Sequence, residues 1–194
     1  MPSKDITLLI AHPDDEALFC WPVLDRVKRI VCVVSDRHNP ERAWCKERGD
    51  CLYEVGRLLG AEVVNLEQNS EFYRLPTRNG ELRALANRMI EAVNDAEIIY
   101  AHNPWGEYGN LDHILCHHVA RTVQAQTGCE LLASDIAQEI NWLPVRRWSI
   151  PVRPDFADAK LDRPLFDRIK AIYDARGCWT WAWEPQATCR VYSL

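Results

Sequence analysis

Residues 6–16 read Ile-Thr-Leu-Leu-Ile-Ala-His-Pro-Asp-Asp-Glu, an apolar run that ends directly in a polar cluster. The apolar part, Ile6 to Ala11, has the length of a buried strand. A helix is expected next, over Asp14 to Leu24, because acidic side chains are favourable in the first turn of a helix. The stretch therefore predicts a strand followed by a helix, which is the repeating unit of α/β folds.

The same alternation continues along the chain. Arg29 to Ser35 is a β-branched run typical of a parallel strand that is covered on both faces. Further strands are expected over residues 62–66, 97–102 and 131–133, and helices over residues 40–59, 80–93, 112–126 and 164–176. Such alternation favours parallel strands joined by right-handed helical crossovers. We predict an α/β fold with a Rossmann-like, mostly parallel sheet and helices on both faces. It would form a single domain over residues 1–194, with an α/β core over 1–130 and an irregular C-terminal extension over 131–194.

Composition and charge exclude several classes of protein. The 194 residues include 23 Lys plus Arg and 28 Asp plus Glu, for a net charge of −5, and 47% are hydrophobic, close to an average globular domain. No basic stripe is present, which argues against nucleic acid as a partner. The apolar runs are far shorter than the roughly 20 residues of a spanning helix. Because no signal peptide is recognisable at the start either, we expect no membrane span and a cytoplasmic location.

The eight cysteines show no C-x-x-C spacing, so neither a zinc ribbon nor a redox motif is indicated. A chain of this length does not depend on disulfides for its stability. We expect free thiols that are buried or partly buried.

The first candidate site residues lie at the end of the first strand. Ligands of open α/β sheets bind beyond the carboxyl ends of the strands. His12 and Asp15 flank Pro13, so a tight turn would bring together an imidazole and a carboxylate, which are ordinary zinc ligands. Asp14 would lie beside the metal, where a general base for a metal-bound water is needed. The plainer interpretation is that the acidic run only caps a helix.

A second group follows the strand expected over residues 97–102. His113 opens a helix and would be the third ligand, and three protein ligands with one open position are typical of catalytic zinc sites. Asp112, next to it, would orient a neighbouring ligand. His117 lies one turn further on, so the pair His113 and His117 stays open as an alternative.

Ala11-His-Pro-Asp-Asp-Glu16, together with Gly106-Glu-Tyr-Gly109 leading into Asp112-His113, resembles the motifs of the LmbE/PIG-L family of zinc-dependent N-deacetylases. The resemblance covers roughly residues 6–126. It implies a Rossmann-like fold and removal of an N-acetyl group from an amino sugar of the GlcNAc type or its conjugate. It also implies a divalent metal, usually zinc, although iron or cobalt would suit the same ligands. By motif position, the metal ligands would be His12, Asp15 and His113, and Asp14 would be the base for a metal-bound water that attacks the amide carbonyl.

The chain departs from the family pattern at Asn110, where the family usually has a His three residues before its last ligand. An Asn side chain can donate a hydrogen bond to a developing oxyanion, but it cannot act as a general acid at neutral pH. Asp14, once protonated, would then deliver the proton to the leaving amine, with His102 or His117 as substitutes. The alternative function is a catalytically weak or non-catalytic sugar-binding protein. A phosphohydrolase or nucleotide-binding protein is disfavoured, because no Gly-rich loop follows the first strand.

Substrate contacts are expected from the loops that follow the strands. Arg37 and Arg74 would bind sugar hydroxyls or a phosphate, and Trp105, Glu107 and Tyr108 come from the loop after the fourth strand, where the aromatic rings would stack on a sugar. Each of these residues also fits a surface ion pair or a packing aromatic. The expected partner is a small-molecule amino sugar, and a homo-oligomer stays open.

Trp179-Thr-Trp181-Ala-Trp183 alternates with a period of two. The alternation predicts a strand with three indoles on one face. Core packing or an oligomer interface is the favoured role of these rings, because large aromatics dominate both, and a sugar-stacking wall is the minority interpretation.

Overall fold

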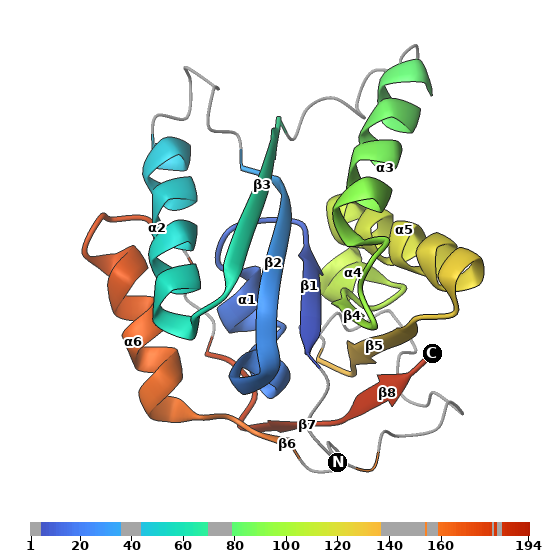
Figure 1. Ribbon diagram of the computed structural model, residues 1–194. Helices are drawn as coiled ribbons and strands as arrows, with labels where there is room; N and C mark the ends of the chain where they lie inside the picture. The colour runs from blue at the N-terminus through green and yellow to red at the C-terminus, as the bar shows by residue number, and fades with distance from the viewer. Residues whose placement is uncertain are drawn as a thin grey trace.

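A computed structural model describes residues 5–35, 44–69, 79–136, 154, 159–179, 181 and 184–194. Its helices and strands alternate along most of the chain (Figure 1). In chain order they are β1 (Ile6–Ile10), α1 (Asp15–Leu18), the 3-10 helix η1 (Trp21–Arg26), β2 (Val27–Val34), α2 (Trp44–Leu59), β3 (Glu62–Gln68), α3 (Asn79–Val93), β4 (Ile98–Ala101), α4 (Gly106–Gly109), α5 (Leu111–Thr127), β5 (Glu130–Ser134), β6 (Ala159–Lys160), α6 (Arg163–Asp174), β7 (Thr188–Cys189) and β8 (Val191–Ser193).

The described strands form one large sheet in the order β3-β2-β1-β4-β5-β8 and a small sheet of β6 and β7. The strands β1 to β5 are parallel to their neighbours, and β8 lies antiparallel to β5. The strand order reverses between β1 and β4, and ligands of such sheets bind at this reversal, beyond the carboxyl ends of the strands. The predicted α/β fold with a mostly parallel sheet is confirmed.

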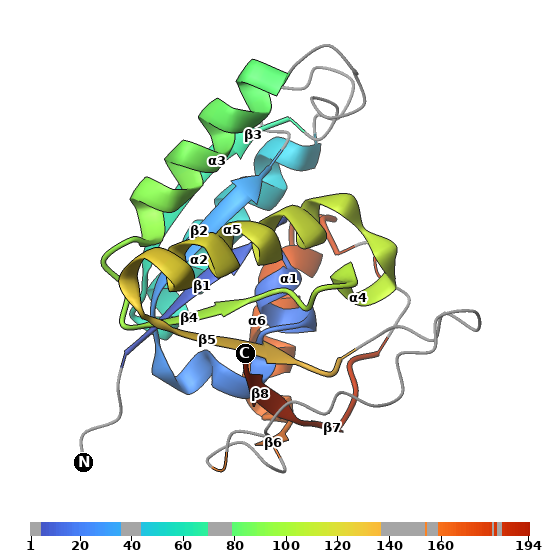
Figure 2. The same ribbon diagram turned by 90° about the vertical axis from the view of Figure 1, so that its right-hand side faces the viewer.

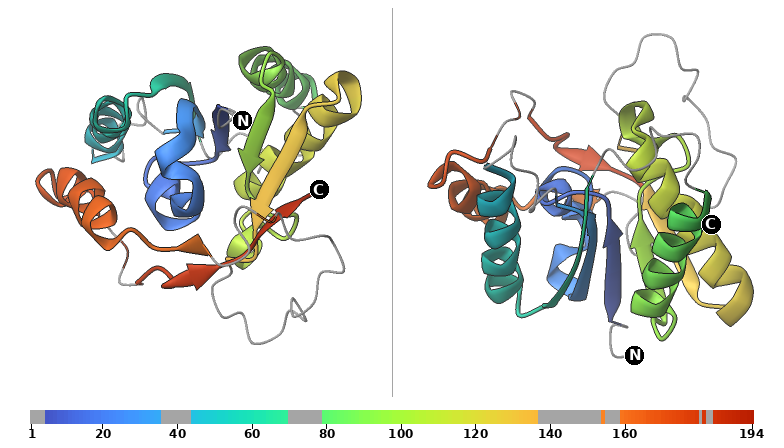
Figure 3. Two further views of the ribbon diagram at one scale, coloured as in Figure 1. Left: turned by 60° about the horizontal axis from the view of Figure 1, so that its bottom comes forward. Right: turned by 90° about the horizontal axis from the view of Figure 1, so that it is seen from above.

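Both faces of the sheet are covered by helices, with α2 and α6 on one side and α3 and α5 on the other (Figure 3). Successive residues of β1, and Ala11 directly after it, belong to different hydrophobic clusters: Leu8 and Ile10 face the cluster that includes α6, and Leu9 and Ala11 face the cluster that includes α5. All four side chains are fully buried. This burial on both faces explains why four of the five residues of the strand are apolar.

The helix predicted over residues 14–24 is divided in two. Helix α1 ends at Leu18, and a 3-10 helix begins at Trp21 with Pro22 in its first turn. Pro22 causes the division, because proline has no N–H to donate to the preceding turn and its ring crowds that turn. The helix predicted over residues 40–59 agrees with α2 from Trp44 to its end at Leu59, and its predicted start over residues 40–43 lies outside the described part of the chain.

Residues after 130 take part in the same sheet and core. Strand β8 pairs with β5 beside the C-terminus (Figure 2). Helix α6 buries Phe166, Ile169 and Tyr173 in the hydrophobic cluster that also contains residues of β1 such as Leu8 and Ile10.

The predicted tryptophan strand is wrong for the residues that the structure describes. Trp179 and Trp181 lie outside any strand, and Trp183 lies outside the described residues. The chain turns at Cys178, whose N–H donates to the carbonyl of Tyr173, and Trp179 then packs edge-on against Phe166. The indole of Trp181 instead points to Asp14. Core packing is thus the role of Trp179.

Two further expectations concern the chain as a whole. The seven cysteines whose side chains are described are free and buried, as expected from their spacing. None of the described helices has the length and hydropathy that a membrane span requires.

Candidate metal centre

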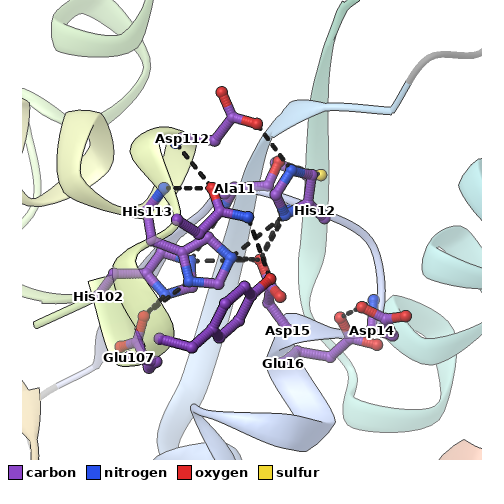
Figure 4. Close-up of polar contacts among 12 residues, drawn as sticks. Ala11, His12, Asp14, Asp15, Glu16, His102, Glu107, Asp112 and His113 are labelled. Atoms are coloured by element: carbon purple, nitrogen blue, oxygen red, sulfur yellow. Dashed lines mark hydrogen bonds and ion pairs between the residues drawn. The ribbon is translucent and has the colours of Figure 1, made fainter. Parts of the chain in front are cut away.

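His12, Asp15 and His113 bring three potential ligand atoms to one point (Figure 4). The Nδ1 atom of His12 lies 3.4 Å from Oδ2 of Asp15 and 3.3 Å from Nε2 of His113, and the third side of the triangle is 3.5 Å. Bonds of about 2.0–2.1 Å to a tetrahedral zinc ion require ligands about 3.3–3.4 Å apart. The three residues therefore fit a zinc-sized divalent ion with almost no rearrangement. We name them the metal triad.

The local fold explains how two distant segments meet here. His12 and Asp15 belong to the turn that follows β1, and the N–H of His12 donates to Oδ2 of Asp15 over 2.7 Å. His113 lies in the first turn of α5, which follows β4, the strand next to β1. The side chains of Asp15 and His113 are almost completely buried, whereas that of His12 is 16% exposed, so solvent reaches the triad from the side of His12.

Each histidine of the triad is held from behind by a carboxylate. Nε2 of His12 lies 2.9 Å from Oδ2 of Asp112, and Nδ1 of His113 lies 2.7 Å from Oε2 of Glu107. A proton on each of these nitrogens leaves the other ring nitrogen with its lone pair toward the metal position. Metal-binding histidines are usually oriented in this way. Asp112 thus contacts the ring nitrogen of His12 that is not part of the triad.

Glu107 is buried against His102 and His113, although the sequence predicted that it would contact the substrate. Its carboxylate is buried and accepts hydrogen bonds from the N–H of Asn103 and from Nδ1 of both His102 and His113. A group that is enclosed in this way cannot reach a sugar. Its N–H in turn donates to the Asn103 side chain, which explains how this residue tolerates a positive φ of 56°.

His102 is a site residue to which sequence reasoning gave only a minor role. Its ring stacks on that of His113 at 3.8 Å, and its Nε2 accepts the N–H of Ala11 and lies 3.2 Å from Asp15. Its Nδ1 is 3.0 Å from Glu107, a hydrogen-bond length that is too short for two ligands of one tetrahedral ion. His102 thus supports the triad and does not compete with it.

The alternative pair of His113 and His117 is not supported. Nδ1 of His117 lies 2.8 Å from the main-chain oxygen of His102 and donates to it. Among the described residues, both groups that could hold a metal contain His113, and neither contains His117.

The charges of the site depend on burial and on these pairs. Burial disfavours the charged ring of His12, but hydrogen bonds to Asp112 and Asp15 outweigh it and raise its pKa to about 9. Burial, together with the nearby His102, lowers the pKa of His113. Burial acts against the charged form of Glu107 as well, yet His102 and His113 hold its pKa at about 2. With a pKa of about 9, His12 is protonated at neutral pH, and a metal ion at its Nδ1 would have to displace that proton.

This proton predicts a pH-dependent metal affinity. Because the pKa of His12 is raised to about 9, the affinity should rise about tenfold per pH unit between pH 6 and 8 and level off above pH 9. Calorimetric titration with Zn²⁺ in buffers of different ionisation enthalpy should show about one proton released at pH 7. An affinity that stays constant between pH 6 and 8 would contradict the protonation of His12.

Asp14 lies to the side of the triad (Figure 4). It stands at the N-terminus of α1, but its side chain makes no capping hydrogen bond, so the plain interpretation as a helix cap does not hold. Arg48 donates to its Oδ2 from Nε at 3.1 Å and Nη2 at 2.5 Å, and Trp181 donates to the same oxygen from Nε1 at 3.1 Å. Oδ1 is buried without a hydrogen-bond partner in the described structure. Oδ1 is thus the atom available to accept a proton.

Burial raises the pKa of Asp14 to about 6, although the charge of Arg48 works in the opposite direction. A general base functions best when its pKa lies near the working pH, because it must be ionised and still accept a proton. No local pattern in the sequence links Arg48 or Trp181 to Asp14. Both approach Asp14 from elements that lie far away in the chain.

Asn110 caps helix α5. Its side-chain oxygen accepts from the N–H of Asp112 at 2.8 Å and of His113 at 3.4 Å, and its amide nitrogen donates to the hydroxyl of Tyr108 at 3.0 Å. The ring of Tyr108 packs edge-on against His113, 5.3 Å away, and burial raises the pKa of its hydroxyl well above the usual range. Tyr108 therefore keeps its proton beside the metal triad.

Two of the expected substrate contacts are half-buried aromatics of α4 and its N-cap, Trp105 and Tyr108. Tyr108 also meets Trp181 edge to face at 5.8 Å, and the Trp181 indole donates to Asp14, so the rings of Tyr108 and Trp181 pack together beside Asp14. The other two, Arg37 and Arg74, lie outside the described residues.

Solved structures share the fold at low sequence identity. A deacetylase of the teicoplanin biosynthesis pathway, in complex with teicoplanin, has a TM-score of 0.65 at 10% identity, covering 96% of this chain and 97% of that one. The A40926 pseudoaglycone deacetylase Dbv21 has a TM-score of 0.60 at 17% identity, covering 89% and 81%. GalB, the 4-carboxy-2-hydroxymuconate hydratase of Pseudomonas putida KT2440, has a TM-score of 0.51 at 14% identity, covering 99% and 96%. Since a hydratase shares this fold, the fold alone does not decide the reaction.

Sequence comparisons place the chain in a family. A comparison with curated protein sequences finds no significant match. The sequence profile described as PIG-L: GlcNAc-PI de-N-acetylase matches residues 7–124, which is more than half of the chain. The matched segment contains the whole metal triad and Asp14. The chain therefore belongs to the GlcNAc-PI de-N-acetylase (PIG-L) family.

Proposed function

We propose that the protein is a metal-dependent N-deacetylase that removes an acetyl group from an amino sugar of the GlcNAc type or from a conjugate of it. The observation that carries the proposal is the metal triad, whose ligand atoms are 3.3–3.5 Å apart beside a buried carboxylate with one unpartnered oxygen. Family membership adds the reaction class. Zinc is the proposed metal, because two imidazoles and one carboxylate are among its usual ligand sets.

A bound divalent ion supplies Lewis acidity and lowers the pKa of water. The residues of the chain supply the rest of the chemistry. Oδ1 of Asp14 takes the proton of the water that attacks the amide carbonyl, while Arg48 and Trp181 keep Oδ2 in place. The same carboxyl group, now protonated, delivers the proton to the leaving amine. No other side chain is needed as a general acid, which fits the presence of Asn110 where the family usually has a His.

Hydrogen bonds from Asn110 and Tyr108 would stabilise the oxyanion that develops on the carbonyl. Asn110 has two amide hydrogens, and one of them is directed to the Tyr108 hydroxyl. The Tyr108 oxygen thus accepts from Asn110 and still holds its own proton to donate. The pair would replace the single histidine of the usual family pattern.

We expect the Asn110→Ala substitution to lower kcat about 10²-fold, the lower range for the loss of one oxyanion donor. It should also destabilise the protein by about 1 kcal/mol, because helix α5 loses its N-cap. The Asn110→Ser variant is the matched control for the cap, since serine caps helices about as well as asparagine. Both variants should lose turnover, but only Asn110→Ala should lose stability in thermal denaturation. Normal kcat in the serine variant would contradict the donor role.

The function itself is tested with purified protein loaded with Zn²⁺. Free N-acetylglucosamine, a nucleotide-linked form and a lipid-linked form are incubated with it, and the free amine and acetate are measured. We expect equimolar amine and acetate from at least one substrate, and none after chelation of the metal. If zinc binds but no substrate releases amine, the non-catalytic sugar-binding alternative, which Asn110 favours, is the better description.

A further inference from the structure

The main chain at Asp14 adopts a conformation that side chains rarely accept. Its φ of 94° and ψ of −20° lie in the left-handed region, and the residue is fully buried. Residues other than glycine hold such a conformation only where the surrounding structure fixes it. Neighbouring groups must therefore hold Asp14 in this conformation.

Glu16 contacts the main chain of Asp14 directly. Its Oε2 accepts the N–H of Asp14 at 2.9 Å, as the dashed line between the two residues in Figure 4 shows. The Glu16 side chain is fully buried, so it needs a second partner of its own to be stable there.

Tyr173 is that second partner. Its hydroxyl donates to Oε1 of Glu16 over 2.6 Å, although the two residues are 157 positions apart in the chain. Tyr173 belongs to α6, is completely buried and packs against the ring of Trp179. The hydroxyl group is thus fixed by the core of the protein and not by solvent.

We propose that Tyr173 is a positioning residue for the deacetylation, because through Glu16 it fixes the main chain at Asp14 and thereby places the Asp14 carboxylate beside the metal triad. The inference rests on the proposed function. Arg48 and Trp181 hold the carboxylate end of the same residue, so both ends of Asp14 are fixed from outside its own motif. The competing explanation is that Tyr173 and Glu16 form a buried polar pair that serves only stability.

Two conservative variants separate these explanations. Tyr173→Phe removes only the hydroxyl that reaches Glu16. Tyr100→Phe is the matched control, because Tyr100 is also buried in the same core and donates one hydrogen bond, to the main-chain oxygen of Phe19 at 2.9 Å. Both variants should lose a similar amount of thermal stability and keep their zinc affinity.

Turnover should differ between the two. We expect kcat of Tyr173→Phe to fall about 10-fold to 100-fold at unchanged KM, because a small displacement of a catalytic group is costly. Tyr100→Phe should keep its kcat. In a Glu16→Met background, Tyr173→Phe should lower kcat little further, since the thioether offers no strong acceptor to Asp14 or Tyr173 and the connection is already broken. If Tyr173→Phe and Tyr100→Phe have the same kcat while the wild type is active, the positioning role of Tyr173 is overturned and the proposed function is not.

A measurement without substrate provides a second readout. In ¹⁵N-labelled protein, the amide proton of Asp14 should be protected from exchange, and Tyr173→Phe should change its shift and protection, whereas Tyr100→Phe should not. An unchanged Asp14 amide in Tyr173→Phe would overturn the inference whatever the activity. A wild-type chain that binds zinc but releases no amine would instead overturn the proposed function, and the positioning role with it.

Discussion

Asp14→Asn should lower kcat by about 10³-fold, within the range for loss of a general base, while the protein still binds its metal. The amide of asparagine cannot take a proton from water at neutral pH. None of the metal triad atoms belongs to Asp14, so the ligand geometry should persist. The measurement combines kcat on the best amino-sugar substrate with the metal content of the purified variant by elemental mass spectrometry.

The exposed Asp25 provides the matched control, and Asp25→Asn should keep full turnover. Asp14→Asn should also melt at a lower temperature than the wild type, because Arg48 loses a charged partner in a buried position. Assays are therefore run well below the melting temperature of the variant. Turnover within a factor of a few of the wild type would exclude Asp14 as the base.

His113→Ala should abolish tight metal binding. The substitution removes one of three ligands, so we expect the affinity for Zn²⁺ to fall by more than about 100-fold, the upper range for loss of a residue that only supports a ligand. Amine release should disappear together with the metal. Zinc affinity is measured by calorimetry, and bound metal by elemental mass spectrometry after gel filtration.

His118 lies on the same helix and is exposed, so His118→Ala is the control for general effects of removing an imidazole from α5. It should bind zinc like the wild type. Both groups of described residues that could hold a metal contain His113. A His113→Ala variant that kept its zinc would therefore rule out both groups and with them the proposed centre.

Local sequence patterns were sufficient to predict most of the strands and helices, because each element depends on the spacing of apolar residues over a short stretch. The predominantly apolar sequence of β1 identifies a strand covered on both faces. Helix α5 ends at Thr127, one residue beyond the predicted end, and Gly128 follows it with a positive φ of 73°, which glycine accepts without strain. The division of the first helix escaped prediction, although Pro22 within the pattern is a sequence signal for a break.

The candidate ligands were also accessible from sequence, since His12 and Asp15 share one turn and His113 follows a second strand. Their order along the chain, and the place of each at the end of a strand, leads to the carboxyl edge of a parallel sheet. The sequence could not tell which neighbouring polar groups face the metal position and which lie behind it. Glu107 illustrates the difference, because its motif suggested a substrate contact and the structure buries it against His113.

The sequence by itself determined the strand-helix alternation and the polar residues at the strand ends. Only the tertiary structure decided how Asp14 is held, since Arg48, Tyr173 and Trp181 approach it, directly or through Glu16, from segments 34 to 167 positions away in the chain. Local patterns record propensity and periodicity, which act over a few residues. Hydrogen bonds between buried groups depend on which helices the sheet brings together, and no short pattern in the sequence contains that information.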